Sequence, residues 1–231
     1  MALQEWSNPE LAEVYSQKAA NPEVNWFEYE VNLPAMVSLI PDDARMVLDF
    51  GSGAGDITAI LSQMYEHVEG CDPSPAMQEI SRSNFPELSF FEWDATTPLE
   101  GRAGYYDAVF SKLTMQFVED LKLVAKQLFA VLKRGGSLVF SVPHPLSTVR
   151  KIDDTTRYWE QAPYSTEIGS YGIRVTMIHR SIQDYVAPFI EAGFVLTAFD
   201  EPSIPAEIAE KHDASEADTT FPKRINLRFQ K

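Results

Sequence analysis

The chain has 231 residues, and the 45% that are hydrophobic suffice for the core of one large domain. Asp and Glu outnumber Lys and Arg by 34 to 19, and the formal net charge of −15 argues against a nucleic-acid partner, because neutralising phosphates requires a basic face. The single cysteine, Cys71, excludes an internal disulfide and a cysteine-rich zinc site, and we expect no metal.

The N-terminal residues lack the basic and apolar blocks of a signal peptide, and no apolar run approaches the roughly 20 residues that a membrane span needs. We therefore expect a cytoplasmic protein that does not bind a membrane. The oligomeric state is not predicted by any of these features.

Short apolar runs typical of strands alternate along the chain with amphipathic segments typical of helices. This alternation predicts an α/β fold built around a doubly wound, mainly parallel sheet. The predicted strands are residues 46–50, 67–71, 88–92, 108–111, 137–142, 194–199 and 225–229, and the main predicted helices are residues 57–65, 75–84, 119–132 and 181–192.

A glycine-rich turn, read as VLDFGSGAGD over residues 47–56, joins the first predicted strand to a helix. The glycines Gly51, Gly53 and Gly55 permit positive φ and let a ligand approach the backbone closely. Their G-x-G-x-G spacing differs from the G-x-G-x-x-G of dinucleotide sites, and Asp56 beside them would repel a diphosphate. The pattern favours a nucleoside that lacks phosphates and carries a cationic part, a description that S-adenosylmethionine fits.

Asp72 ends the second predicted strand, 21 positions after Gly51. In doubly wound sheets a carboxylate at this place accepts hydrogen bonds from ribose hydroxyls. The alternative is that Asp72 only caps the turn formed by residues 73–75.

The segment VLDFGSGAGDIT, residues 47–58, resembles the first motif of class I S-adenosylmethionine-dependent methyltransferases. Later segments follow the order of that family from about residue 25 to the C-terminus. The resemblance implies a Rossmann-like methyltransferase fold of seven strands, whose last strand runs antiparallel beside the sixth. It also implies that the cofactor is S-adenosylmethionine and that the turn binds it through Asp49, Gly51, Ser52, Gly53 and Gly55.

The resemblance assigns adenine contacts after the second and third strands. Pro73 and Met77 would line the ring, Asp94 would accept a hydrogen bond from the adenine amino group, and the amide of Ala95 would donate to the ring. The alternative for Asp94 is an ordinary loop residue.

Three further cofactor contacts follow from the resemblance. Ser111 ends the fourth strand, Gln116 stands where family members often carry His and would contact the methionyl part, and Tyr15 lies on an N-terminal helix where a tyrosine can touch the methionine carboxylate. Core packing is the alternative for Tyr15.

Methyl transfer from a sulfonium is an in-line displacement with a good leaving group, so positioning and desolvation can supply much of the catalysis. A hydroxyl, phenol or protonated amine acceptor benefits from a general base, for which histidine is well suited. His144 is the candidate base, and His144, His179 and Arg180 resemble acceptor-side positions of a small-molecule branch of the family. A structural role, such as a hydrogen-bonded hinge, is the alternative for both histidines.

Residues 143–180 are too long and too irregular for an ordinary crossover and are expected to form a lid over the carboxyl ends of the strands, where open α/β sheets bind ligands. Tyr158, Trp159, Tyr164 and Tyr171 would wall an acceptor pocket there or form the lid's own small core. We expect one methyltransferase domain over residues 1–231. Its parts are an N-terminal helical lid (1–40), the cofactor-binding core (41–142), the substrate lid (143–180), and the last helix with strands six and seven (181–231).

The predicted function is methyl transfer to an oxygen or nitrogen nucleophile of a small-molecule acceptor. Residues 111–114 lack the Asn/Asp-Pro-Pro-aromatic tetrad of base-modifying methyltransferases, which further disfavours nucleic acid. One alternative is a non-catalytic regulatory protein that binds S-adenosylmethionine. Another is a nicotinamide-dependent oxidoreductase, which the glycine spacing and the absence of a Tyr-x-x-x-Lys pair disfavour.

Overall fold

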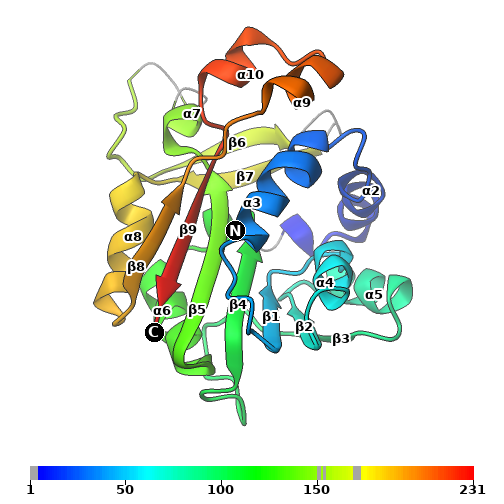
Figure 1. Cartoon of the computed structure of the whole chain (residues 1–231), viewed down its shortest axis with the longest axis vertical. Coiled ribbons are helices and arrows are strands. Elements are labelled where there is room, and N and C mark those ends of the chain that lie inside the picture. Colours follow the sequence, from blue (N-terminus) through cyan, green and yellow to red (C-terminus); the bar gives the residue numbers. More distant parts are fainter. Residues whose placement is uncertain (1–4, 150–151, 153–154, 169–172) are drawn as a thin grey trace.

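The computed structural model describes residues 5–149, 152, 155–168 and 173–231. Within them, a seven-stranded sheet has the order β3-β2-β1-β4-β5-β9-β8 (Figure 1). Neighbouring strands pair in parallel except β9, which is antiparallel to both β5 and β8. The strands are β1 (Met46–Phe50), β2 (His67–Cys71), β3 (Ser89–Phe91), β4 (Tyr106–Lys112), β5 (Leu132–Pro143), β8 (Val195–Asp200) and β9 (Arg224–Gln230). This topology confirms the predicted fold class, including the antiparallel last strand.

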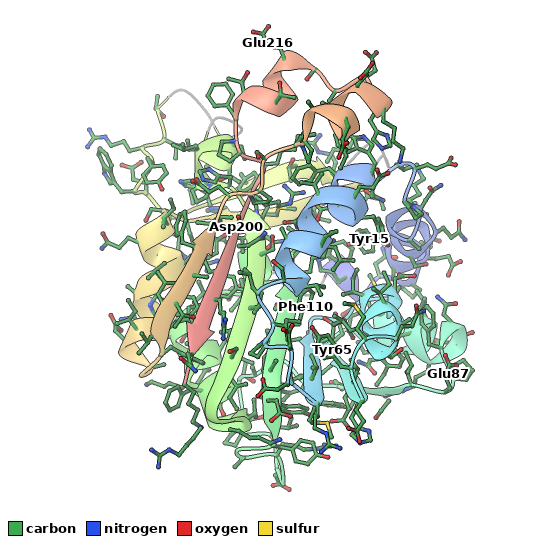
Figure 2. All side chains as sticks on the ribbon, viewed as in Figure 1. Tyr15, Tyr65, Glu87, Phe110, Asp200 and Glu216 are labelled. Carbon is green, nitrogen blue, oxygen red and sulfur yellow. The ribbon has the colours of Figure 1, made fainter. Side chains whose placement is uncertain are left out.

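Successive residues of the central strands alternate between two cores, because side chains of a strand point to opposite faces of its sheet. Leu48 and Val109 belong to the core covered by α6 (Leu121–Val131) and α8 (Ile182–Glu191). Val47 and the fully buried Phe110 (Figure 2) belong to the core covered by α3 (Leu33–Val37) and α4 (Asp56–Ser62). Burial on both faces explains why these strands are mainly apolar.

The largest differences from the predicted element boundaries are at the start of β5 and the end of α4. Helix α6 ends at Val131, and the predicted end of the helix, residues 132–136, instead belongs to β5, where Gly135 has a φ of 79°. Helix α4 stops at Ser62, whereas α5 (Pro75–Asn84) has the predicted limits.

Residues 143–180 are more regular than expected. The described part contains α7 (Pro145–Val149) and an antiparallel pair, β6 (Ala162–Ile168) and β7 (Ile173–His179). The buried residues of β7 recur at every second position, and this face packs in one apolar cluster with Trp6 and Phe117. The β6–β7 pair therefore shares an apolar core with the N-terminal residues and with η2. Tyr171 lies outside the described residues.

The remaining elements lie around the same end of the sheet (Figure 1). They are α2 (Pro9–Ala19), the π-helical turn η1 (Phe27–Asn32), the 3-10 turn η2 (Met115–Phe117), α9 (Ala206–Lys211) and α10 (Glu216–Thr220). No helix among the described residues is long and apolar enough to cross a membrane.

Candidate active site

The glycine turn follows β1 directly, and its three glycines all have positive φ: 78° at Gly51, 52° at Gly53 and 92° at Gly55. A Cβ at Gly51 would lie 2.1 Å from Oγ1 of Thr114, so this glycine is required by a close approach as well as by its backbone conformation. Around Gly53 a Cβ would meet nothing within 4 Å. The turn therefore packs tightly against the loop after β4 at one glycine and is open at the next.

Asp72 ties this turn to the end of β2. Its Oδ2 accepts a hydrogen bond from the Gly53 amide at 3.0 Å, and its Oδ1 accepts one from the Ser74 amide at 2.9 Å. Burial raises the pKa of this carboxyl to about 6. The turn-capping hydrogen bond that was the alternative is therefore present. Each carboxylate oxygen nevertheless has a second lone pair available to a ligand.

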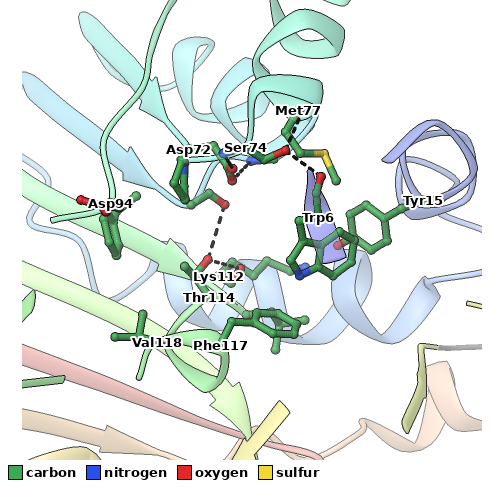
Figure 3. Close-up of a pocket in the computed structure, with 15 residues that line it drawn as sticks. Trp6, Tyr15, Asp72, Ser74, Met77, Asp94, Lys112, Thr114, Phe117 and Val118 are labelled. Atoms are coloured by element: carbon green, nitrogen blue, oxygen red, sulfur yellow. Dashed lines mark hydrogen bonds between the residues drawn. The ribbon is translucent and has the colours of Figure 1, made fainter. Parts of the chain in front are cut away.

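A pocket lies beside Asp72 (Figure 3). Seven of the predicted cofactor residues line it: Tyr15, Gly51, Gly53, Asp72, Pro73, Met77 and Asp94. We call it the first pocket. Oδ1 of Asp94 accepts hydrogen bonds from the Thr96 amide at 2.8 Å and the Thr96 hydroxyl at 2.7 Å.

Other predicted cofactor residues support the first pocket without lining it. Asp49 is buried below the turn and accepts a hydrogen bond from the Thr58 hydroxyl at 2.7 Å, and burial raises its pKa to about 7. Ser111 donates from its hydroxyl to the Phe50 carbonyl at 2.9 Å and so fixes β4 against the end of β1. Ser52, Gly55 and Ala95 are also buried, and Ala95 has a φ of 56°.

Sequence reasoning missed several residues that line the first pocket: Trp6, Lys112, Leu113, Thr114, Phe117 and Val118. Trp6 lies between Tyr15 and Phe117, with ring centroids 4.8 and 5.5 Å away (Figure 3), and its carbonyl accepts a hydrogen bond from the Ser74 hydroxyl at 2.7 Å. Nothing in its local sequence predicts this position. Residues 112–114 could have been predicted to line a pocket, because they lie at the end of a predicted strand of the sheet.

A second pocket shares a wall with the first. Both are lined by Trp6, Tyr15, Leu113 and Phe117. The rest of the second pocket is formed by Gln116, Pro143, Ser147, Tyr164, Thr166, Glu167, Met177 and Arg224. The structure places Tyr164 in this pocket, and it places Gln116 here rather than in the first pocket.

His144 lines neither pocket, and it is 1% exposed. Its Nδ1 accepts a hydrogen bond from the Leu146 amide at 3.2 Å, so Nε2 carries the proton that faces Glu201 Oε1 at 2.6 Å. Both ring nitrogens are thus engaged at the start of α7. This geometry matches the hinge alternative and gives no support to His144 as a general base.

His179 is also fully buried away from both pockets. Its Nδ1 lies 2.6 Å from the Thr148 hydroxyl, and its Nε2 lies 2.9 Å from the Tyr158 carbonyl. These bonds join α7, the segment before β6 and the end of β7. Tyr158 and Trp159 line neither pocket, and Trp159 is 68% exposed.

Arg180 acts on the loop after β4. Its guanidinium is 2% exposed and donates hydrogen bonds to the carbonyls of Met115, Val118 and Glu119. It therefore holds η2 and the residues around it, including Phe117, which lines both pockets. Arg180 is a positioning residue in this structure and does not itself line a pocket.

Comparison of the sequence with known protein families identifies the part of the chain that supplies most of the first pocket. Residues 48–140, which contain the glycine turn, Asp72 and Asp94, match a family model described as a methyltransferase domain. This match supports a class I S-adenosylmethionine-dependent methyltransferase. The resemblance of the first motif is therefore confirmed, and S-adenosylmethionine is the cofactor that the family implies.

Sequence relatives of this methyltransferase domain include two bacterial enzymes named trans-aconitate 2-methyltransferase. The one from Methylobacterium radiotolerans is 33% identical over 126 residues, which are 52% of this chain and 48% of the relative. The one from an Enterobacter species is 30% identical over 143 residues, 61% of this chain and 52% of the relative. The chain thus spans about half the length of the curated relatives it matches.

Solved structures of methyltransferases share the fold. An S-adenosylmethionine-dependent methyltransferase from Mesorhizobium loti aligns with a TM-score of 0.71 and 22% identity over 86% of this chain and 96% of its own. One from Methanosarcina mazei aligns with a TM-score of 0.65 and 17% identity over 86% and 97% of the two chains. At these identities the likeness concerns the fold alone.

Proposed function

We propose that this protein transfers the methyl group of S-adenosylmethionine to a small-molecule acceptor bound in the second pocket. The observation that carries the proposal is the wall of Trp6, Tyr15, Leu113 and Phe117 that the two pockets share. A donor in the first pocket and an acceptor in the second would meet at this wall. The match of residues 48–140 supports the donor, and it leaves the nicotinamide alternative without support.

The residues of the first pocket fit the cofactor. Asp72 offers its remaining lone pairs to the ribose hydroxyls, Pro73 and Met77 supply apolar surface for adenine, and Asp94 offers a carboxylate to its amino group. The open space at Gly53 lets a ligand approach the backbone. The aromatic rings of the shared wall suit a sulfonium cation, which is attracted to the faces of such rings.

When bound, S-adenosylmethionine supplies an electrophilic methyl group and a neutral thioether as leaving group. The chain positions the acceptor for in-line attack and excludes water from the shared wall. Trp6 is 9% and Phe117 7% exposed, so this wall is largely dry.

We propose a carboxylate oxygen as the methyl acceptor. Two relatives are named for trans-aconitate, an organic acid. A carboxylate is ionised at neutral pH and needs no general base. This suits the second pocket, where burial raises the pKa of Tyr164 to about 12 and no histidine is among the described lining residues.

The four-part domain organisation accompanies this proposal. The N-terminal residues 1–40 and the lid, residues 143–180, would close the two pockets over the core, residues 41–142, while residues 181–231 complete the sheet. Trp6 and Tyr15 from the first part and Tyr164 from the third meet at the second pocket, which supports the assignment of both parts as lids.

Isothermal titration with S-adenosylhomocysteine tests the donor site, and a methyl-transfer assay with trans-aconitate tests the reaction. We expect binding and formation of a methyl ester. Absence of cofactor binding would refute the proposal. Tight binding without transfer to trans-aconitate or to a wider panel of organic acids would favour the regulatory alternative.

A further inference from the structure

Glu28 is a buried carboxylate that contacts two cations. It lies on the π-helical turn η1 and is 9% exposed. Its Oε1 accepts a hydrogen bond from Arg224 Nε at 2.8 Å, and its Oε2 lies 3.2 Å from Lys112 Nζ and accepts a hydrogen bond from Asn32 at 2.9 Å. Burial alone would raise the pKa of Glu28, but Arg224 and Lys112 lower it to about 2. Glu28 is therefore ionised at neutral pH.

The two cations reach different pockets. Lys112 ends β4 and lines the first pocket, whereas Arg224 begins β9 and lines the second. Two positive charges share one negative charge, so these three residues, the Glu28 cluster, carry a net positive charge. This charge is the opposite of the chain's overall −15. Each pocket thus has one cation of the cluster at its lining, and this favours an anionic group of a ligand beside Lys112 or Arg224.

Arg224 retains donors for a ligand. Its hydrogen bonds to Glu28 and to the Lys223 carbonyl use only some of its N–H groups. A guanidinium held in a fixed orientation binds a carboxylate through paired N–H donors, with a geometry that a lysine cannot reproduce. Glu28 fixes that orientation at the edge of the second pocket.

Gln116 gives an independent indication of a polar ligand in the same pocket. Its Nε2 donates to the Leu113 carbonyl at 2.6 Å, which fixes the orientation of the amide. The Oε1 atom is then buried with no partner among the described residues, and the side chain is 2% exposed. A buried acceptor without a partner is unfavourable, and a ligand hydroxyl or N–H would satisfy it.

We propose that Arg224 selects the acceptor by binding an anionic group on it, and that Gln116 Oε1 accepts a hydrogen bond from a hydroxyl or N–H of the same molecule. Glu28 is the positioning residue of Arg224. The acceptor class is thus a small carboxylic acid, and an acid that also carries a hydrogen-bond donor should bind more tightly than one without, such as ionised trans-aconitate. This inference rests on the proposed function for its assignment of the second pocket to the acceptor.

Binding of three probes to the protein loaded with S-adenosylhomocysteine tests this inference by isothermal titration. Citrate has carboxylates and a hydroxyl, tricarballylate is the same skeleton without the hydroxyl, and triethyl citrate is uncharged. We expect citrate to bind at least about tenfold more tightly than triethyl citrate, and about two- to tenfold more tightly than tricarballylate. Equal affinity for citrate and triethyl citrate would overturn the role of charge, and equal affinity for citrate and tricarballylate would overturn the role of Gln116.

Variants of Arg224 test whether this residue is responsible for the affinity for citrate. Arg224→Gln should weaken citrate binding about 10- to 100-fold and change S-adenosylhomocysteine affinity by less than about threefold. Arg224→Lys, which keeps the charge beside Glu28, should fall between this variant and the wild type. Arg45→Gln removes the same charge from an exposed pair with Glu66 and serves as the matched control. Wild-type citrate affinity in both Arg224 variants would overturn the inference.

The wild-type protein separates the two proposals. Binding of S-adenosylhomocysteine without binding of citrate would overturn the acceptor class and leave the donor site standing. Failure to bind S-adenosylhomocysteine would refute the proposed function, and this inference with it.

Discussion

Glu28 Oε1 accepts a hydrogen bond from Arg224 Nε at 2.8 Å across 196 positions of the chain. This bond joins the π-helical turn η1 to the first residue of β9, which lines the second pocket. Because a buried carboxylate must be paired to stay ionised, the contact has consequences for stability as well as for ligand binding.

Glu28→Gln should lower the free energy of unfolding by about 3 kcal/mol, because it leaves two largely buried cations without their shared partner. Urea unfolding measures this, with Glu66→Gln, in an exposed pair, as a control expected to cost less than about 1 kcal/mol.

The effect of Glu28→Gln should also depend on pH. The folded pKa of Glu28 is about 2, below the ordinary 4.5, so its stabilisation is fully present above pH 4.5 and is lost as the pH falls toward 2. The difference between wild type and variant should therefore shrink between pH 5 and pH 3. A difference that stays constant over this range would contradict the ion-pair explanation.

Asp49→Asn should raise the free energy of unfolding, whereas Glu28→Gln lowers it. The folded pKa of Asp49 is about 7, above the ordinary 3.8, because burial disfavours its charged form. The unfolded chain therefore releases this proton first, and Asp49 destabilises the protein progressively as the pH rises from about 4 to 7.

Asparagine keeps an oxygen for the Thr58 hydroxyl and carries no charge, so its stabilising effect in the unliganded protein should grow over this range to on the order of 4 kcal/mol. Thermal unfolding at pH 5 and pH 8 measures it, with the exposed Asp43→Asn as control. An equal gain at both pH values would show that Asp49 is ionised in the folded state throughout.

Asp72→Ala should weaken S-adenosylhomocysteine binding about 10- to 100-fold, as expected for the loss of one or two charge-assisted hydrogen bonds to the ribose. Asp72→Asn, which retains one oxygen acceptor, should lose less. Isothermal titration measures both, and the exposed Glu92→Gln on the neighbouring strand end is the control. Unchanged affinity in Asp72→Ala would remove the ribose assignment.

Gly51→Ala should lower the free energy of unfolding by about 2–5 kcal/mol, since it combines an unfavourable positive φ with a contact 2.1 Å from Thr114 Oγ1. Gly101→Ala is the matched control, because Gly101 has a φ of 72° but open space around its Cβ position. It should cost only about 1–2 kcal/mol. Equal losses in the two variants would show that Thr114 moves aside easily.

The sequence by itself determined the features that depend on near neighbours in the chain. Alternation of apolar residues predicted the strands, and the glycine spacing predicted a turn with positive φ. Asp72 was placed because it ends the second strand of a doubly wound sheet, and Asp94 was assigned by the family resemblance. These predictions hold because strand periodicity and backbone torsions are set by a few consecutive residues.

Only the tertiary structure decided how the acceptor side is built. It turned His144 and His179 into buried hinge residues, made Arg180 a clamp on the loop after β4, and brought Trp6 and Arg224 to the pockets. The partners of these side chains lie tens to hundreds of positions away, and a buried polar group is defined by the partner that satisfies it. Residue type and local spacing carry no information about such a partner, so the chemistry of the second pocket became visible only in the folded chain.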